Sequence, residues 1–165
     1  MLSASVFKEP SDRIVLQTNM GDIEIRLLPE HAPDIAENFR LLAQDNYYDG
    51  VPFHRIIKGF MIQSGDFENF DGTGGHAYGG GLLEDEFSPQ LSHVRGAVSM
   101  ANRGPNTNGS QFFIVQKDAP FLDGKHSIFG QVVNGMDTVD RIANVKTDLN
   151  DAPLETVEIK NVLVP

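Results

Sequence analysis

The sequence contains no cysteine, which excludes disulfide bonds and any catalysis by a thiolate. Its histidines lack the tight spacing that zinc sites show; the five are His31, His54, His76, His93 and His126. We therefore expect no metal site.

Basic residues are few, because 13 lysines and arginines stand against 23 aspartates and glutamates, for a formal net charge of -10. Phosphate binding needs concentrated Lys and Arg, so we expect no nucleic-acid partner. No apolar run approaches the ~20 residues of a membrane span, and we expect no membrane attachment. The start of the chain lacks the charged and apolar regions of a secretory signal. A cytoplasmic protein is the expectation.

The 165 residues fit one domain with a proper core, and 16 glycines and 9 prolines favour a turn-rich β architecture. We expect a short N-terminal arm over residues 1–11 and a single domain over 12–165. Alternating apolar residues predict a hairpin formed by 13–18 and 22–27. A helix should begin at Pro33, because proline suits the first turn.

The remaining pattern predicts further strands and one more helix. A second amphipathic helix is expected over 136–145. The strands are expected at 53–57, 60–64, 97–101, 111–115, 128–133 and 154–163. Pattern alone therefore gives a mainly β domain with two helices.

Polar groups stand among large apolar residues in two stretches of the chain, 53–66 and 106–115. Arg55 and Gln63 lie in the segment 53–66, and Gln111 directly precedes the apolar run 112–115. An unpaired buried amide costs roughly 2–7 kcal/mol, so such placements need partners. Outward-pointing polar residues on half-exposed strands are the simpler interpretation of any one of them. Together they indicate a polar edge on an apolar pocket.

An ordered series of motifs carries a family resemblance. The motifs are Phe53-His-Arg-Ile-Ile-Lys-Gly-Phe-Met-Ile-Gln63, Ser64-Gly-Asp66, Gly72-Thr-Gly-Gly75, Glu84-Asp-Glu86, Ser99-Met-Ala-Asn102, Gly104-Pro-Asn-Thr-Asn-Gly-Ser-Gln-Phe-Phe113, Leu122-Asp-Gly-Lys-His126 and Phe129-Gly130. From about Ile14 to Val164 the chain resembles the cyclophilins, the peptidyl-prolyl cis-trans isomerases that bind cyclosporin.

The resemblance implies an eight-stranded antiparallel closed barrel capped by two α-helices, with substrate bound on an outer face. It implies a monomer that isomerises X–Pro bonds in proline-containing peptides and proteins, assists folding and uses no cofactor. A non-catalytic module that binds proline peptides within a larger assembly is the alternative. The presence of Arg55 favours catalysis.

Isomerisation of an X–Pro bond needs a donor aimed at the proline nitrogen, since the twisted amide localises a lone pair there. Arg55 suits this task because its rigid fork of N–H groups stays charged. By resemblance Arg55 is the central catalytic residue, and Gln63 and Gln111 orient it and the substrate. Asn102 would contact the substrate backbone, and His126 would lie at the rim of the pocket.

The resemblance also assigns binding positions. Phe60, Met61, Phe113 and Leu122 would form the proline pocket, where aromatic faces and an adaptable methionine suit the ring. His54 would position a neighbouring loop. The positions lining a second pocket for residues upstream of the proline would be Gly72, Thr73 and Ala101.

The sequence departs from the family pattern at two places: the segment His76-Ala-Tyr-Gly-Gly80, which bears on the preference for residues upstream of the proline, and Phe121. Phe121 stands where many cyclophilins have a tryptophan just before the Leu-Asp-Gly-Lys-His motif. Cyclosporin should therefore bind, but more weakly, because the indole N–H donor is missing.

Overall fold

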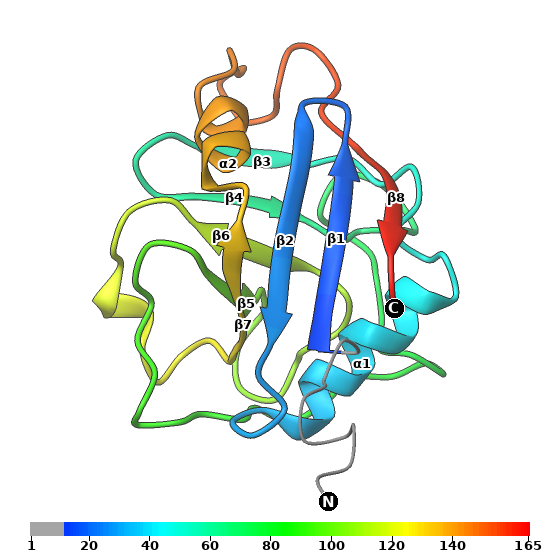
Figure 1. Ribbon diagram of the computed structural model, residues 1–165, viewed down its shortest axis with the longest axis vertical. Coiled ribbons are helices and arrows are strands. Elements are labelled where there is room, and N and C mark those ends of the chain that lie inside the picture. Colours follow the sequence, from blue (N-terminus) through cyan, green and yellow to red (C-terminus); the bar gives the residue numbers. More distant parts are fainter. Residues whose placement is uncertain (1–11) are drawn as a thin grey trace, which may run out of the picture.

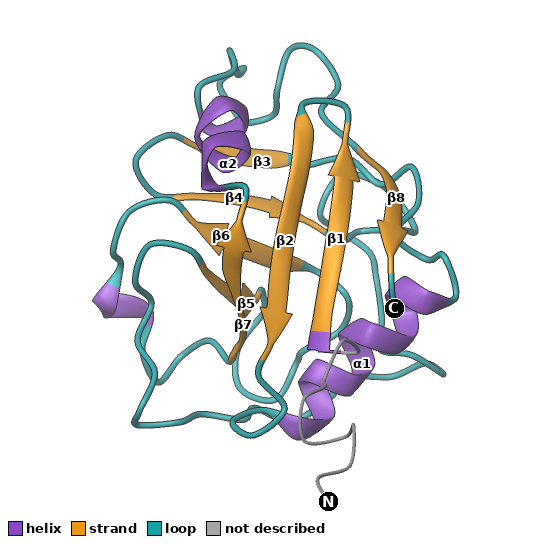
Figure 2. Cartoon of the chain, viewed as in Figure 1, coloured by secondary structure: helices purple, strands orange, loops and turns teal. Residues whose placement is uncertain are grey.

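The computed structural model describes residues 12–165, so the expected N-terminal arm, 1–11, lies outside the described residues. The described part has eight strands, two α-helices and one short 3-10 helix (Figures 1 and 2). The strands are β1 Arg13–Thr18, β2 Gly21–Leu27, β3 Arg55–Ile57, β4 Met61–Ser64, β5 Ala97–Met100, β6 Phe112–Val115, β7 Ile128–Asn134 and β8 Ile159–Leu163. The helices are α1 Pro33–Gln44, α2 Met136–Ala143 and η3 Pro120–Leu122.

The expected hairpin and both α-helices are confirmed, and three expected elements are shorter than the pattern predicted by two or more residues. β3 begins at Arg55 rather than at residue 53, β8 covers only the end of the range 154–163, and α2 ends at Ala143. The β1–β2 turn is tight: the Thr18 hydroxyl donates to the Gly21 carbonyl at 2.6 Å. Gly21 has a φ of +133°, which side-chain-bearing residues rarely adopt.

All strand pairs are antiparallel, in the order β3-β4-β6-β5-β7-β2-β1-β8. The expectation of a closed barrel is wrong, because no ladder joins the two end strands, β3 and β8, in the described chain. Only an isolated bridge between Pro52 and Glu158 and single bonds such as Phe53 N–H to the Val157 carbonyl, at 2.7 Å, span this gap. Pro52 has no N–H to donate, so a regular ladder cannot run through it.

The two α-helices lie at opposite ends of the sheet (Figure 1). Phe39 of α1 is fully buried, with ring centroids 5.0–5.1 Å from Tyr48, Phe112 and Phe129. This aromatic group anchors α1 in the main core, which fills the inside of the curved sheet.

A second, smaller apolar cluster lies on the outer face of the sheet. Strand alternation separates the two clusters: in β6, Phe112 and Ile114 belong to the main core, and Phe113 and Val115 belong to the outer cluster. β4, β5 and β6 are therefore buried on both faces, and the outer cluster is where the candidate site begins.

A carboxylate distant in sequence caps α1. Ala32 makes no side-chain cap, and instead Glu86 accepts the backbone N–H groups of Asp34, at 3.1 Å, and Ile35, at 2.8 Å. A negative charge there also suits the positive end of the helix dipole. The long segment between β4 and β5 is thereby tied to the helix.

Glu86→Ala should lower the free energy of unfolding by about 1–2 kcal/mol, because it removes an N-terminal cap and a favourable charge. Urea denaturation measures this, with Glu84→Ala, an exposed carboxylate two residues earlier, as the control. Equal losses in the two variants would contradict the capping role.

Candidate active site

Four residues on neighbouring strands form a row across the outer face. Arg55 of β3 stands opposite Gln63 of β4, Gln63 opposite Phe113 of β6, and Phe113 opposite Ser99 of β5. Directly opposed residues point to the same face with Cβ atoms about 5 Å apart. The strand register therefore places exposed Arg55 next to Gln63 on the adjacent strand, and two strands away from Phe113.

A chain of hydrogen bonds leads from Arg55 into the neighbouring loop. Arg55 Nη1 donates to Gln63 Oε1 at 3.2 Å, and Gln63 Nε2 donates to Gln111 Oε1 at 3.0 Å. Gln111 Nε2 then donates to the carbonyls of Gly72 and Gly74, both at 2.8 Å. Because the Gln63 carboxamide both accepts and donates, its orientation is fixed. The polar groups singled out in the apolar strands are thus each other's partners.

A buried carboxylate holds the loop that receives this chain. Asp66 is fully buried and accepts five backbone N–H groups at 2.8–3.2 Å. They belong to Glu68, Asn69, Asp71, Gly72 and Gly74. Burial raises the pKa of Asp66, but the backbone donors outweigh it and lower the pKa to about 2. The loop is therefore wrapped around one ionised group.

The apolar part of the site has a buried floor and half-buried walls. Met61 and Phe113 are 1% and 4% exposed, and Phe60 and Leu122 pack against them from more open positions. The His126 ring stands edge-on to Phe113, with centroids 5.4 Å apart. His126 Nδ1 lies 2.8 Å from the Met100 carbonyl and so must donate to it.

A second imidazole, that of His93, also packs against Phe113. His93 is stacked on Phe113, with centroids 6.0 Å apart and ring planes at 14°. Its Nδ1 lies 2.7 Å from Asp123 Oδ1, and its Nε2 lies 2.8 Å from Ser99 Oγ. Burial lowers the pKa of His93 despite the opposing effect of Asp123, so the ring is neutral at neutral pH.

The Ser99, His93 and Asp123 set has the order of hydrogen bonds found in hydrolytic triads. Ser99 is fully buried, however, so its hydroxyl cannot reach a substrate. The set instead locks the Phe113 ring and ties the loop after η3 to β5.

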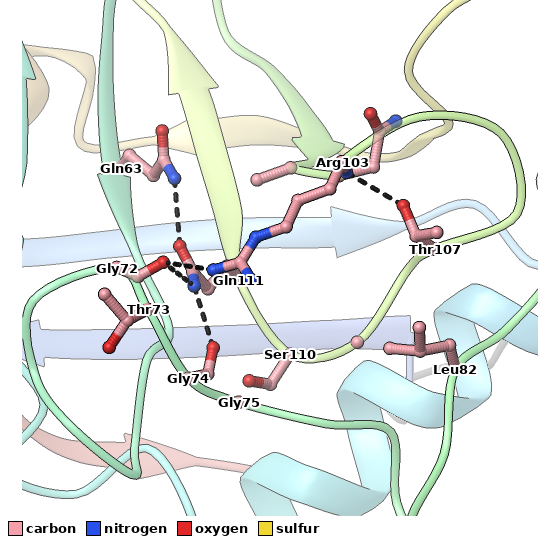
Figure 3. A pocket seen from close by; sticks show the side chains of 13 residues that line it. Gln63, Gly72, Thr73, Gly74, Gly75, Leu82, Arg103, Thr107, Ser110 and Gln111 are labelled. Atoms are coloured by element: carbon pink, nitrogen blue, oxygen red, sulfur yellow. Dashed lines mark hydrogen bonds between the residues drawn. The ribbon is translucent and has the colours of Figure 1, made fainter.

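A cavity of about 310 Å³ lies beside the hydrogen-bonded chain (Figure 3). Gly72, Thr73 and Ala101, the expected second-pocket positions, line it together with Gln63 and Gln111. Asn102 is also at its edge, and its side chain donates to the Lys125 carbonyl at 2.9 Å. The structure thus places a polar cavity next to the apolar floor on one face.

Comparison with known proteins assigns the family. The family model of cyclophilin type peptidyl-prolyl cis-trans isomerases matches residues 13–164. The chain is 52% identical to the peptidyl-prolyl cis-trans isomerase CYP71 of Arabidopsis thaliana, covering 93% of this chain and 24% of that protein. It is 53% identical to the peptidyl-prolyl cis-trans isomerase-like 1 of Rhizopus delemar, covering 85% of each chain.

A solved structure agrees with this assignment. The cyclophilin type isomerase of Cryptosporidium parvum, crystallised in the presence of the dipeptide Ala-Pro, superposes with a TM-score of 0.89 at 36% identity, covering 93% of this chain and 98% of that one. The chain belongs to the cyclophilin-type peptidyl-prolyl cis-trans isomerase family. It spans only about a quarter of the length of the first of these relatives, the Arabidopsis protein.

In this cyclophilin-type chain, two predicted positions stand apart from the central chain of hydrogen bonds. Phe121 is 63% exposed on η3 and packs on Phe60, with centroids 5.7 Å apart. His54 lies behind the loop, where a Cβ at Gly72 would come within 2.9 Å of its Nε2. The close packing of loop and imidazole accounts for glycine at position 72, which also has a φ of +97°.

Other contributing residues escaped the sequence reasoning. Asp66 belongs to the Ser64-Gly-Asp66 motif, but the sequence alone indicated no role for its carboxylate. His93 gave no local signal because its hydrogen-bond partners, Ser99 and Asp123, lie 6 and 30 residues away. Arg103, which lines the cavity, could have been noticed as a lone cation in a loop of small and amide residues.

The described residues also bear on metals and membranes. Within 12–165 there is no group of three or more His, Cys, Asp or Glu side chains placed to hold a metal ion. No helix in the same range has the length and apolar character to cross a bilayer.

Asp66→Asn should lower the free energy of unfolding at neutral pH by roughly 2–3 kcal/mol, because the amide cannot accept all five N–H groups and loses the charge. The lowered pKa of Asp66 means that its stabilisation is complete above the unfolded pKa of about 4 and is lost as pH falls toward about 2. Wild type should therefore show a fall in stability across this window that the variant lacks.

Urea denaturation at a series of pH values measures both effects. Asp22→Asn, at an exposed carboxylate of β2, is the matched control and should keep the wild-type profile. An Asp66→Asn protein with wild-type stability at neutral pH would show that the loop does not depend on this group.

Proposed function

We propose that this chain is a peptidyl-prolyl cis-trans isomerase that accelerates rotation about X–Pro bonds in peptides and proteins and so assists their folding. The observation that carries the proposal is the row in which Gln63 joins the exposed Arg55 to Phe113 of the apolar floor. The Ala-Pro dipeptide present with the Cryptosporidium relative supports a proline ligand for such a site.

The uncatalysed bond rotates over a barrier of about 20 kcal/mol, because rotation breaks amide resonance. An acceleration of about 10⁵-fold requires lowering that barrier by about 7 kcal/mol. No covalent step is needed. In the twisted amide the proline nitrogen becomes pyramidal and gains a lone pair, so a donor aimed at that nitrogen stabilises the transition state more than the planar substrate.

Arg55 would supply that donor. Its guanidinium uses one N–H on Gln63 and keeps others for the substrate. Gln63 and Gln111 would hold the guanidinium in place, since the Gln63 amide donates to Gln111 and the Gln111 amide donates to the Gly72 and Gly74 carbonyls. Preorganisation matters because a donor already in position costs no reordering when the bond twists.

The neighbouring groups would bind the chain on either side of the bond. The proline ring would pack on Phe113 and Met61, between Phe60 and Leu122, with His126 at the rim. Residues upstream of the proline would enter the cavity beside Gly72, Thr73 and Ala101, and the backbone at Asn102 would pair with the peptide. His54 would support the loop from behind.

Arg55→Ala should lower kcat by about 10²–10³-fold, by analogy with removal of one oxyanion donor, and should leave peptide affinity largely unchanged. Arg55 is exposed on a short edge strand, so the fold should survive. NMR exchange spectroscopy on a short X–Pro peptide measures the catalysed rate, and a titration gives the affinity.

Lys58→Ala, which removes an exposed cation three residues away, is the control and should keep wild-type turnover. The alternative function, a binding module without turnover, predicts that wild type binds the peptide without any exchange cross-peaks. Near-wild-type activity in a folded Arg55→Ala protein would exclude the proposed mechanism.

Cyclosporin should bind the same apolar surface, and Phe121→Trp should tighten that binding by about three- to thirtyfold. The indole N–H would donate a hydrogen bond worth roughly 0.5–1.5 kcal/mol to a cyclosporin carbonyl, which would otherwise be left unpaired. Each ~1.4 kcal/mol changes the affinity tenfold. Phe121 is exposed next to Phe60, which leaves room for the larger ring. Calorimetric titration, with turnover assayed in parallel, is the measurement, and unchanged affinity would show that position 121 does not limit cyclosporin binding.

A further inference from the structure

One cationic side chain reaches across the cavity beside the proposed isomerase site. Arg103 lies on the loop between β5 and β6, and its guanidinium extends to the facing loop, where Nη2 donates to the Gly72 carbonyl at 3.0 Å (Figure 3). The base of the side chain is fixed, because the Arg103 backbone N–H donates to Thr107 Oγ1 at 2.8 Å, and that hydroxyl donates to the Gly104 carbonyl at 2.8 Å.

The hydrogen bond to Gly72 leaves most of the guanidinium free. The Gly72 carbonyl already accepts Gln111 Nε2, so both of its lone pairs are in use. Neither Nη1 nor Nε of Arg103 has a partner in the described chain, although guanidinium carries five N–H donors. The side chain is exposed at the mouth of the cavity, where a ligand can reach these donors.

Arg103 differs from most arginines of this protein in having no carboxylate partner. Of the seven arginines, five form ion pairs with aspartate or glutamate side chains. Within residues 12–165, the two without an ion pair are Arg55 and Arg103, and both border the same stretch of the outer face. The protein has a formal net charge of -10, so two guanidinium groups without carboxylate partners make this site an exception to its overall negative charge.

No negative charge within the cavity offsets Arg103. Among the 13 described residues that line it, none is acidic, and the other lining groups are glycines, amides, hydroxyls and two aliphatic side chains. The nearby loop carboxylates are engaged elsewhere: Asp66 accepts backbone N–H groups, Glu68 accepts the Gly75 N–H at 2.7 Å, and Asp71 accepts the Thr73 N–H at 3.0 Å.

We infer that Arg103 determines specificity by selecting substrates with an acidic side chain, Asp or Glu, upstream of the proline. The inference rests on the proposed function, which places upstream residues in this cavity. A guanidinium presents a planar fork that matches the two oxygens of a carboxylate, whereas the neutral lining groups offer no charge. An upstream glutamate would approach the free edge of Arg103 while the proline ring occupies the apolar floor.

The effect should appear in KM rather than in kcat. Arg103 is remote from the rotating bond and would contact the carboxylate equally in the ground state and in the transition state. An exposed ion pair is modest, so an upstream glutamate should lower KM by about three- to tenfold at low ionic strength. High salt should reduce the preference, because the screening length falls from about 10 Å at 0.1 M to about 3 Å at 1 M.

The test uses two amidated peptides of identical composition and net charge, one with glutamate upstream of the proline and one with it downstream. Because the two peptides have the same net charge, the acidic protein repels them equally. A difference between their KM values therefore reports a local contact. A third peptide has glutamine upstream. Exchange spectroscopy gives kcat and KM for each, and NMR titration gives Kd independently of turnover.

Wild type should show the three- to tenfold lower KM only for the upstream-glutamate peptide. In Arg103→Ala the KM ratio of the two glutamate peptides should fall to about one. In Arg103→Glu the ratio should invert, so that the upstream-glutamate peptide has the higher KM of the two. Lys160→Ala, which removes an exposed cation on β8, should keep the wild-type ratio.

Equal KM values in wild type, or a preference that survives Arg103→Ala, would overturn the inference. So would a uniform rise in KM for all three peptides in Arg103→Ala, because that result identifies Arg103 as a structural link between the two loops. Failure of the proposed function looks different. In that case no peptide is turned over, and the ratio of the Kd values still decides whether Arg103 recognises the carboxylate.

Discussion

The site depends on the register in which β4 pairs with both of its neighbours. Gln63 stands opposite Arg55 on one side and opposite Phe113 on the other, so a single strand joins the polar and the apolar halves of the site. A slip of one residue would turn Gln63 and Met61 toward the interior and bring Ile62 to the outer face. The main core opposes such a slip, because Ile62 and Ile114 are fully buried on the inner face.

The loops over this sheet are held by a few polar anchors in addition to apolar contacts such as those of Phe67 and Leu83. Asp66 gathers five backbone N–H groups, Gln111 joins two carbonyls of the same loop to β6, and Asp123 with His93 fixes the loop after η3. Apart from the exposed Asp123, these anchors are buried or half-buried groups with their hydrogen-bonding capacity used, which favours one loop geometry over others. A rigid frame of this kind suits a catalyst that acts by positioning alone.

Much of the fold could be predicted from the sequence, since alternation and helical spacing report burial directly. The pairing of Arg55, Gln63 and Gln111 was also foreseeable, because polar groups in apolar strands need partners. The open edge of the barrel between β3 and β8 could not be predicted, since it depends on which residues meet across the gap. Pro52 lies there and has no backbone N–H to donate. His93 and Arg103 act through partners in distant loops, which local pattern does not encode. The cytoplasmic location, the monomeric state and the domain limits stay predictions.

In the proposed mechanism, Arg55 acts on the nitrogen of a proline whose ring is held by Phe113 and Met61. A crystal structure of the protein with a bound X–Pro peptide tests it most directly. We expect the proline ring to lie against Phe113, and a guanidinium nitrogen of Arg55 to lie within about 3 Å of the proline nitrogen or of the position that this nitrogen takes on twisting. A peptide bound with its proline elsewhere, and with Arg55 pointing away from it, would contradict the account.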